Sequence, residues 1–397
     1  MDIRRLTESE LRAAHDLFRA TLVQAPVPAE VWAVLAGSYE PGRTLGAFSG
    51  DDLVGTAMAW SSNIRLPGGA VAPMAAVTRV GVRSDHRRRG VMTELMRAQL
   101  VDVAARGEVF AGLHASEPVI YERFGYGVGT LATTTTVDTR WAVPRAELPD
   151  IGGVRLVESS AAIASLPALY ERVGRDRVGT IARPDGWNKV FYDRALVSPE
   201  YTLVAVHSGA DGDDGFVVYE ARTDPVTYRA TLDIGLFSAV DATVAAALWR
   251  FLLGVDLVTK LKVWNRPVDE AVTQMLLDQR ALTLETDTDL WLRIVDVPAA
   301  LAARTYGDAE PVVVEVEDRF LPANRGRYRI GSAGAERVED EPDLVVDVAV
   351  LAMLYLGAWR ATALAEVGRV RVVDPATPAR ADRLFATDRP AWCGTYF

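Results

Sequence analysis

The sequence predicts a layered α+β or α/β fold in which helices pack on β-sheets. Strand-like and helix-like segments alternate through residues 1 to about 290, as expected when helices cover a sheet. Apolar residues make up 49% of the chain and charged residues 24%, which is typical of globular proteins. A length of 397 residues exceeds what one hydrophobic core usually supports, so we expect more than one domain.

Two segments indicate where the domains meet. The stretch TRWAVPRAELPDIGG, residues 139–153, has the prolines and final glycines of a linker. The stretch LWLRIVDVPAALAARTYG, residues 290–307, predicts a helix with Pro298 in its first turn. Beyond it, PVVVEVED and LVVDVAV predict short strands, and LAMLYLGAWRATALAEVG predicts a helix. We therefore predict three domains, over residues 1–145, 146–290 and 291–397.

The composition argues against several classes of protein. A net charge of −10 disfavours a nucleic-acid partner. The one cysteine, Cys393, excludes an internal disulfide framework, and the four histidines argue against a metal centre. The N-terminal residues lack the features of a secretion signal, and charges interrupt the best apolar window around residues 241–256. We expect a cytoplasmic protein without a membrane partner.

The segment VTRVGVRSDHRRRGVMTELMRAQLVDVAARG, residues 77–107, carries the first functional signal. It predicts a strand that contains Val80 and Val82, a basic turn that ends at Gly90, and then a helix. The N–H groups of a first helical turn have no intrahelical acceptor, and the helix dipole favours an anion there. Such a loop suits a pyrophosphate, although the same residues could form only a solvated basic turn.

The next segment, VFAGLHASEPVIYERFGYG, strengthens the functional reading. Residues 109–114 predict a buried strand, residues 120–124 a short helix, and Tyr126 the start of a return strand. The order V-x-V, R-x-x-G and then Y-x-x-x-G-[FY] resembles the acetyl-CoA core of the GCN5-related N-acetyltransferases. The resemblance implies an α+β fold with mixed sheets and acetyl-CoA as co-substrate, without a metal.

The resemblance assigns roles to individual residues. It implies that the backbone around Val80 and Val82 contacts the pantetheine arm, that the loop holds the pyrophosphate, and that Ser116 and Glu117 flank the cofactor. The expected cofactor-binding set is Val80, Gly81, Val82, Arg87, Arg88, Arg89, Gly90, Val91, Met92, Thr93, Ser116 and Glu117. Met92 stands where the superfamily has a small residue, so the packing of the loop must differ.

Tyr121 opens the Y-x-x-x-G-[FY] motif and is the expected general acid. A phenol of pKa about 10 is protonated at neutral pH and can protonate a departing thiolate. The alternative is a core tyrosine whose hydroxyl is only hydrogen-bonded. Tyr126 fits that core role better than Tyr121 does.

The chain outside this segment narrows the resemblance. Residues 228–254 repeat the strand-then-helix plan, but their turn, SAVDA, lacks glycine and arginine, and Asp241 would repel a pyrophosphate. A degenerate second acetyltransferase fold, followed by a domain similar to sterol carrier proteins, resembles the Eis (enhanced intracellular survival) acetyltransferases. Local stretches such as HRRRGVM and LYLGAWRATALA agree. The resemblance implies a homohexamer that acetylates amines such as aminoglycosides.

The same resemblance makes the terminal carboxylate of Phe397 the expected general base. Burial of the Phe397 ring would hold the chain end in place, by about 1.5–3 kcal/mol. His114 is another possible proton acceptor, or else a core histidine. Trp32, Arg79, His114 and Tyr396 are the expected substrate-pocket residues, and Arg79 would repel a polycation if it points inward.

Two other functions fit the sequence. A protein-lysine or polyamine acetyltransferase would use the same motifs. A non-catalytic acyl-CoA or lipid-binding sensor would need only the binding loop and the third domain, although Tyr121 together with an intact loop favours catalysis.

Overall fold

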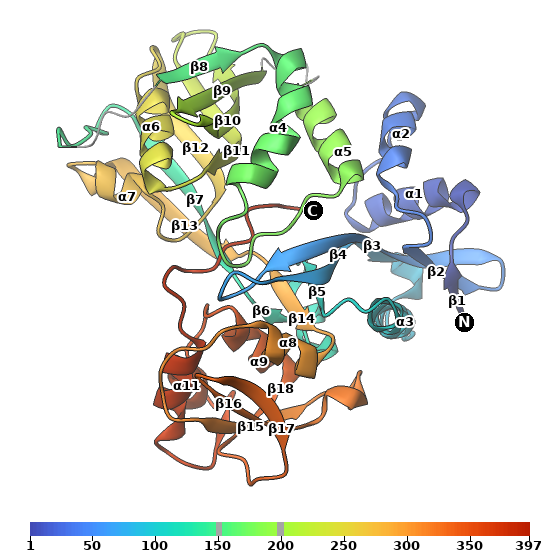
Figure 1. The fold of residues 1–397 in the computed structure, drawn as a ribbon. Coiled ribbons are helices and arrows are strands. Elements are labelled where there is room, and N and C mark those ends of the chain that lie inside the picture. Colours follow the sequence, from blue (N-terminus) through green and yellow to red (C-terminus); the bar gives the residue numbers. More distant parts are fainter. Residues whose placement is uncertain (148–152, 197–201) are drawn as a thin grey trace.

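Three mixed β-sheets organise the molecule, a computed structural model that describes residues 1–147, 153–196 and 202–397 (Figure 1). Each sheet contains one parallel pair of strands among antiparallel ones. The α+β fold with mixed sheets is thereby confirmed. Residues 148–152 of the predicted linker lie outside the described residues. No helix within the described ranges is long and apolar enough to span a membrane.

The first sheet has the strand order β1-β2-β3-β4-β5-β14-β6. Its strands are β1 (Asp2–Arg5), β2 (Thr44–Ser49), β3 (Asp52–Arg65), β4 (Val71–Val82), β5 (Phe110–Leu113), β14 (Trp291–Ile294) and β6 (Gly127–Val128). Helices α1 (Leu11–Thr21) and α3 (Val91–Ala105) cover its two faces, and α2 (Ala29–Leu35) lies beyond α1. Glycines allow the close packing: a side chain at Gly81 would meet Thr21 of α1, and one at Gly55 would meet Leu95 of α3.

The second sheet has the order β13-β7-β12-β11-β10-β9-β8. Its strands are β13 (Leu282–Thr288), β7 (Leu131–Asp138), β12 (Val258–Arg266), β11 (Ala230–Ala239), β10 (Gly212–Thr223), β9 (Thr202–Gly209) and β8 (Gly153–Val157). Its helices are α4 (Ser159–Val173), α5 (Asp185–Leu196), α6 (Ala242–Leu253) and α7 (Val272–Met275). Helix α5 packs against the turn Ala36–Ser38 of the first domain.

The third sheet has the order β17-β16-β15-β18-β19. Its strands are β17 (Gly334–Val338), β16 (Gly326–Gly331), β15 (Val312–Glu317), β18 (Leu344–Asp347) and β19 (Arg371–Val372). Its helices are α8 (Val297–Ala303), α9 (Val348–Tyr355), α10 (Ala361–Glu366) and α11 (Thr377–Phe385). The single helix expected for LAMLYLGAWRATALAEVG is wrong: α9 ends before Gly357, whose φ of +77° breaks the helix, and α10 begins at Ala361.

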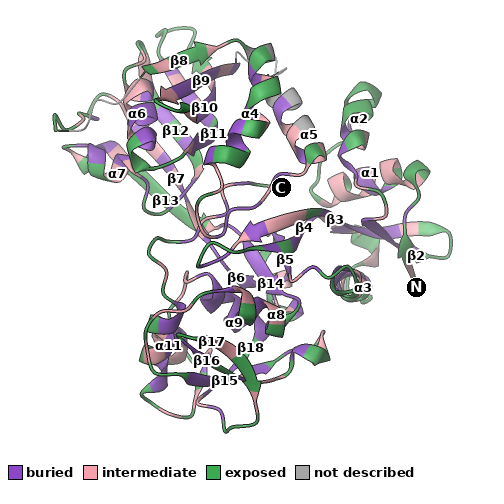
Figure 2. Cartoon of the chain, in the orientation of Figure 1, coloured by how far each residue is buried: buried purple, intermediate pink, exposed green. Residues whose placement is uncertain are grey.

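Two strands cross the domain limits that the sequence suggests. Strand β7 follows the first domain's motifs in the chain but pairs with β12 and β13 in the second sheet. Strand β14, at the start of the predicted third domain, pairs with β5 and β6 in the first sheet. The largest apolar cluster accordingly takes residues from all three sheets, and buried residues concentrate where β5, β14 and α9 meet (Figure 2).

Arg293 of β14 joins the third domain to the first. Its buried guanidinium donates to both oxygens of Asp318 at 2.7–2.8 Å and to the carbonyl of Phe124 at 2.9 Å. Gly125, with φ +86°, leaves the space that this guanidinium occupies, because an added Cβ would lie 2.7 Å from Arg293 Nε. The geometry of the turn after Tyr121 thus depends on a residue far away in the chain.

We predict that Arg293→Met lowers the free energy of unfolding by about 3–5 kcal/mol, because it leaves Asp318 buried without its cation. Thermal unfolding of the purified variants tests this. Arg280→Met removes an arginine that is paired with Asp278 at the surface and should leave the melting temperature unchanged. Equal melting temperatures for the two variants would contradict the prediction.

His15, on α1, belongs to a small aromatic cluster with Trp32 and Tyr39. Its Nδ1 lies 3.0 Å from the Tyr39 hydroxyl, and its ring packs against Trp32. Burial lowers the pKa of His15 to about 4, with the charge of Arg79 as the next cause. The folded protein therefore keeps His15 neutral at a pH where the unfolded chain, with a histidine pKa near 6.5, takes up a proton.

We predict that this histidine makes the protein less stable as the pH falls from about 6.5 toward 4, because only the unfolded chain binds the proton in that range. Melting temperatures at pH 7, 6 and 5 for wild type and His15→Gln test this. The variant should lose less stability on acidification. An unchanged pH dependence would remove His15 from the explanation.

Candidate active site

A cleft opens where β4 and β5 diverge. The parallel ladder between them covers Met74 to Ala76 of β4 and Phe110 to Gly112 of β5. Beyond it, residues 77–82 of β4 and Leu113 and His114 of the facing segment line a cleft of about 1460 Å³. The strand edge that faces this cleft is free of the ladder hydrogen bonds that β5 provides farther back.

A β-bulge distorts β4 at the middle of the cleft. Thr56 pairs with Gly81 and Met58 with Thr78, so Arg79 and Val80 together lie opposite Ala57. Arg79 adopts φ +51°, which is uncommon for a residue with a side chain. Bulges of this kind re-aim side chains next to functional sites. Arg79, Val80, Gly81 and Val82 all line the cleft.

The N-terminus of α3 forms one end of the cleft. Gly90 is the N-cap residue, with φ +81°, and no side chain accepts a hydrogen bond from the first-turn N–H groups. Arg87, Arg88, Gly90, Val91, Met92 and Thr93 line the cleft. Arg89 is exposed and lies outside the lining. Within the described part of the chain, no carboxylate pairs with Arg87 or Arg88, so this end of the cleft presents positive charge and open N–H groups to an anion.

The corresponding helix of the second domain is closed to anions. At the start of α6, one carboxylate oxygen of Asp241 accepts hydrogen bonds from the N–H groups of Thr243 and Val244, at 2.8 and 2.9 Å. A negative charge thus already occupies the position that a phosphate would need. The helix termini at Gly90 and Asp241 thus differ in whether they are open to an anion.

Tyr121 lies on the wall of the cleft between two short 3₁₀ turns, Pro118–Ile120 and Glu122–Phe124. These turns replace the helix expected over residues 120–124. Burial raises the pKa of Tyr121 to about 12, so the phenol holds its proton at neutral pH. No described residue hydrogen bonds with its hydroxyl. Tyr126 is instead fully buried in the core, and its hydroxyl is also unpartnered among the described residues.

Ser116 and Glu117 also line the cleft, on the segment between β5 and Tyr121. The structure therefore brings together the expected cofactor-binding residues other than Arg89. Trp32 does not reach the cleft. It packs against the rings of His15 and Tyr39, which do not line the cleft either.

The C-terminal tail enters the cleft from the side of the second domain (Figure 1). Three successive backbone carbonyls of the tail accept side-chain hydrogen bonds. Arg183 donates to Gly394, His114 to Thr395, and the indole of Trp187 to Tyr396, at 3.2, 2.9 and 2.8 Å. The Thr395 side chain is held by Arg183 and Tyr170. These bonds fix the position of the terminal residue without using its carboxylate.

The aromatic rings contribute less to this anchoring than the sequence suggested. Tyr396 is 48% exposed and Phe397 is only partly buried, whereas Cys393 and Thr395 are buried. Both terminal rings pack against the His114 ring, at 4.6 and 4.8 Å between centroids. Hydrogen bonds to the backbone, rather than burial of the Phe397 ring, therefore hold the chain end.

The two ring nitrogens of His114 face the tail and Asp289. Nε2 lies 2.9 Å from the Thr395 carbonyl and so must donate to it, while Nδ1 lies 3.6 Å from Asp289. Burial lowers the pKa of His114. A histidine that donates its Nε2 proton to the Thr395 carbonyl is placed to hold the tail.

Asp289 and Cys393 also take part in holding the C-terminal tail. The second oxygen of Asp289 accepts from the Cys393 N–H and from the Thr130 hydroxyl, at 3.0 and 2.9 Å. His114, Asp289 and Cys393 place potential ligand atoms within 4.8 Å of one another. Burial raises the pKa of the Cys393 thiol, however, which disfavours the thiolate that a metal would require. These groups form hydrogen bonds that hold the tail in place.

The remaining wall of the cleft comes largely from residues that sequence reasoning missed. Trp60 of β3 belongs to the first domain; Trp187, Phe191, Glu220 and Trp264 belong to the second. A neighbouring hollow of about 320 Å³ shares Phe191, Glu220 and Trp264 with the cleft. No local motif marks the second-domain positions, because only the packing of α5, β10 and β12 next to the first domain brings them here.

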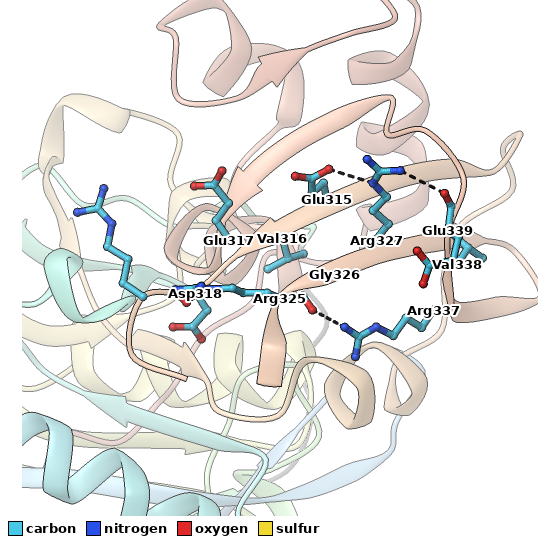
Figure 3. A pocket seen from close by; sticks show the side chains of 11 residues that line it. Glu315, Val316, Glu317, Asp318, Arg325, Gly326, Arg327, Arg337, Val338 and Glu339 are labelled. Atoms are coloured by element: carbon cyan, nitrogen blue, oxygen red, sulfur yellow. Dashed lines mark hydrogen bonds and ion pairs between the residues drawn. The ribbon is translucent and has the colours of Figure 1, made fainter. Parts of the chain in front are cut away.

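A separate hollow on the third domain has a different character (Figure 3). Arginines and acidic residues line it, among them Glu315, Arg327 and Arg337, and several are already paired or bonded to backbone carbonyls. Such a charged surface does not suit a lipid tail. It gives no support to the lipid-binding alternative.

Comparisons with known proteins agree with this architecture. Models described as acetyltransferase (GNAT) domains match residues 2–129 and 179–294, and a sterol carrier protein domain matches residues 297–394. An uncharacterized N-acetyltransferase of Streptomyces avermitilis is 38% identical over 98% of both chains. N-acetyltransferase Eis of Mycobacterium tuberculosis is 35% identical over 87% of this chain and 86% of its own.

The solved structures lead to the same family. The crystal structure of Eis1 from Mycobacterium abscessus superposes with a TM-score of 0.91, at 37% identity and full coverage of both chains. A GCN5-related N-acetyltransferase from Anabaena variabilis shares the fold, with a TM-score of 0.85 at 18% identity. The chain therefore belongs to the Eis family of N-acetyltransferases.

Proposed function

We propose that the protein transfers the acetyl group of acetyl-CoA to a primary amine of a small molecule, with Tyr121 as general acid and the Phe397 carboxylate as general base. One observation carries the proposal: a single cleft runs from the uncapped N-terminus of α3, past the bulged edge of β4, to Tyr121 and the chain terminus. An anion-binding end, an open strand edge and two proton-transfer groups thus share one cavity.

The residues fit acetyl-CoA at both of its ends. Arg87, Arg88 and the first turn of α3 would hold the pyrophosphate through charge and N–H groups. The open edge of β4 at Val80 and Val82 would pair with the pantetheine arm and direct an N–H at the carbonyl oxygen that gains charge. Acetyl-CoA, when bound, supplies the acetyl group as an activated thioester.

Two proton transfers remain for the chain's own groups. The amine nitrogen forms a bond to the acetyl carbon while the carbon–sulfur bond breaks. The amine begins protonated, with a pKa near 10.4, so losing its proton at pH 7 costs about 4.6 kcal/mol. The Phe397 carboxylate accepts that proton. The Tyr121 hydroxyl carries the second transfer: it donates its own proton to the departing sulfur and regains one from the nitrogen as the amide forms.

Release of free thiol from acetyl-CoA across a panel of amines tests the reaction. Aminoglycosides, spermidine, free lysine and a lysine peptide cover the acceptor classes. Acceptor-dependent release identifies an enzyme and its acceptor. Binding of acetyl-CoA without release for any amine would favour the sensor. The homohexamer also stays a prediction, and analytical ultracentrifugation tests it.

We predict that Tyr121→Phe lowers kcat by about 10²–10⁴-fold with little change in the KM for acetyl-CoA, because only the transferable proton is lost. Since no described residue bonds the Tyr121 hydroxyl, the variant should fold normally. Tyr126→Phe is the matched control: it removes a hydroxyl from the same motif that lies in the core. Equal kcat values for the two variants would exclude Tyr121 as the acid.

We predict that adding one glycine after Phe397 lowers kcat at least about 100-fold at pH 7, because the carboxylate moves while the hydrogen-bonded tail stays. Activity of this variant should rise with pH toward the amine pKa of about 10.4, as unprotonated amine accumulates. Phe397→Leu keeps the carboxylate and should retain most activity. An extended enzyme with the wild-type rate and pH profile would exclude the terminal base.

A further inference from the structure

We propose that Arg79 binds a carboxylate on the acceptor, so that the enzyme prefers amines that carry a carboxylate over polycationic amines. The inference rests on the proposed acetyl transfer and narrows its acceptor. Arg79 lines the cleft and adjoins Val80, on the bulge of β4. A cation at this position meets the acceptor next to the strand edge where the thioester would lie.

Arg79 has no carboxylate partner. Its Nη2 donates to the hydroxyl of Ser38 at 2.8 Å, and its Nη1 approaches the sulfur of Met58 at 3.1 Å. Throughout the described residues, no carboxylate forms a salt bridge with it, the terminal carboxylate included. The Tyr39 side chain also bonds with it, so its described partners are two hydroxyls and a thioether, none of which carries a negative charge.

The buried arginines of the chain are satisfied differently from Arg79, which is only partly exposed. Arg43, Arg266 and Arg293 each pair with a buried carboxylate. Arg183 and Arg304 lack one but donate to backbone carbonyls and sit away from the lining of the cleft. Arg79 differs from both groups, because it lines the cleft and has neither a carboxylate nor a backbone-carbonyl partner among the described residues. Burial lowers its pKa. An anionic ligand group would supply the missing partner.

The surroundings hold the guanidinium ready for such a group. Its carbon lies 4.2 Å from the Tyr39 ring centroid and 5.3 Å from that of Trp60. Ser38 is itself fixed by hydrogen bonds to Leu35 and from the Trp60 indole. Stacked arginines keep their planar edge free for two parallel hydrogen bonds, the geometry that a carboxylate accepts. The left-handed backbone at Arg79 is a strained conformation of the kind found at ligand contacts.

A polycation would meet this site unfavourably. Bringing several ammonium groups next to an uncompensated guanidinium in a partly desolvated cleft adds like-charge repulsion. The terminal carboxylate of Phe397, which lines the same cleft, can instead face the amine end of the acceptor. A molecule with an amine and a carboxylate matches both kinds of charge.

Matched acceptors test the proposal. Lysine and cadaverine differ by the carboxylate alone, as do phenylalanine and phenethylamine. We expect wild-type kcat/KM to favour the carboxylate member of at least one pair about tenfold or more. In Arg79→Met the ratio should fall to about one, and Arg79→Lys should restore part of it. If Arg79 had a purely structural role, Arg79→Met would lower kcat/KM for both members of a pair equally and leave their ratio unchanged.

Two controls separate this proposal from the proposed function. Arg4→Met removes an arginine that stacks on Phe48 outside the cleft lining and should keep the wild-type ratio. Equilibrium binding of the same pairs, followed by tryptophan fluorescence, needs no turnover. Absent turnover with carboxylate-selective binding that Arg79→Met abolishes would reject acetyl transfer and support Arg79. Preference for cadaverine and phenethylamine, or a ratio that Arg79→Met leaves unchanged, would overturn the inference.

Discussion

The proposed chemistry depends on holding the C-terminal tail at a fixed position inside a cleft between two domains. A terminal segment without secondary structure has unpaired backbone groups and loses much conformational entropy when it is ordered. Side chains from Arg183, His114 and Trp187 compensate by binding three consecutive carbonyls. Asp289, beside β14, holds both His114 and the Cys393 N–H, so the tail is fixed to the same region that joins the three sheets.

The strand exchange explains why this attachment can be rigid. Because β14 fills the space between β5 and β6, the third domain is connected to the first sheet by backbone hydrogen bonds rather than by a surface contact alone. The pair of Arg293 with Asp318 lies just behind the turn that carries Tyr121. The proposed acid, Tyr121, and the proposed base, the Phe397 carboxylate, thus come from distant parts of the chain. Both are held by the region around β14.

The N-termini of α3 and α6 differ in whether a side chain binds their free N–H groups. Helix α3 starts at Gly90 with its N–H groups open, whereas α6 starts at Asp241, whose carboxylate binds those groups. The second domain has instead become a wall: Trp187, Phe191 and Trp264 close the acceptor side of the first domain's cleft. Two domains of one fold therefore differ in whether the N-terminus of their helix is open to an anion.

The sequence by itself determined the features that depend on local spacing. The strand, the basic turn before Gly90, helix α3 and the position of Tyr121 follow from residues close together in the chain, whose geometry local hydrogen bonds and φ preferences decide. The family resemblance and the aromatic terminus predicted a role for Phe397. The tertiary structure alone decided the rest. It placed β7 and β14 in sheets beyond their chain neighbours, turned Trp32 away from the cleft, and gave Arg79 a cavity without a counter-ion. These outcomes depend on long-range packing between surfaces, which no local pattern encodes.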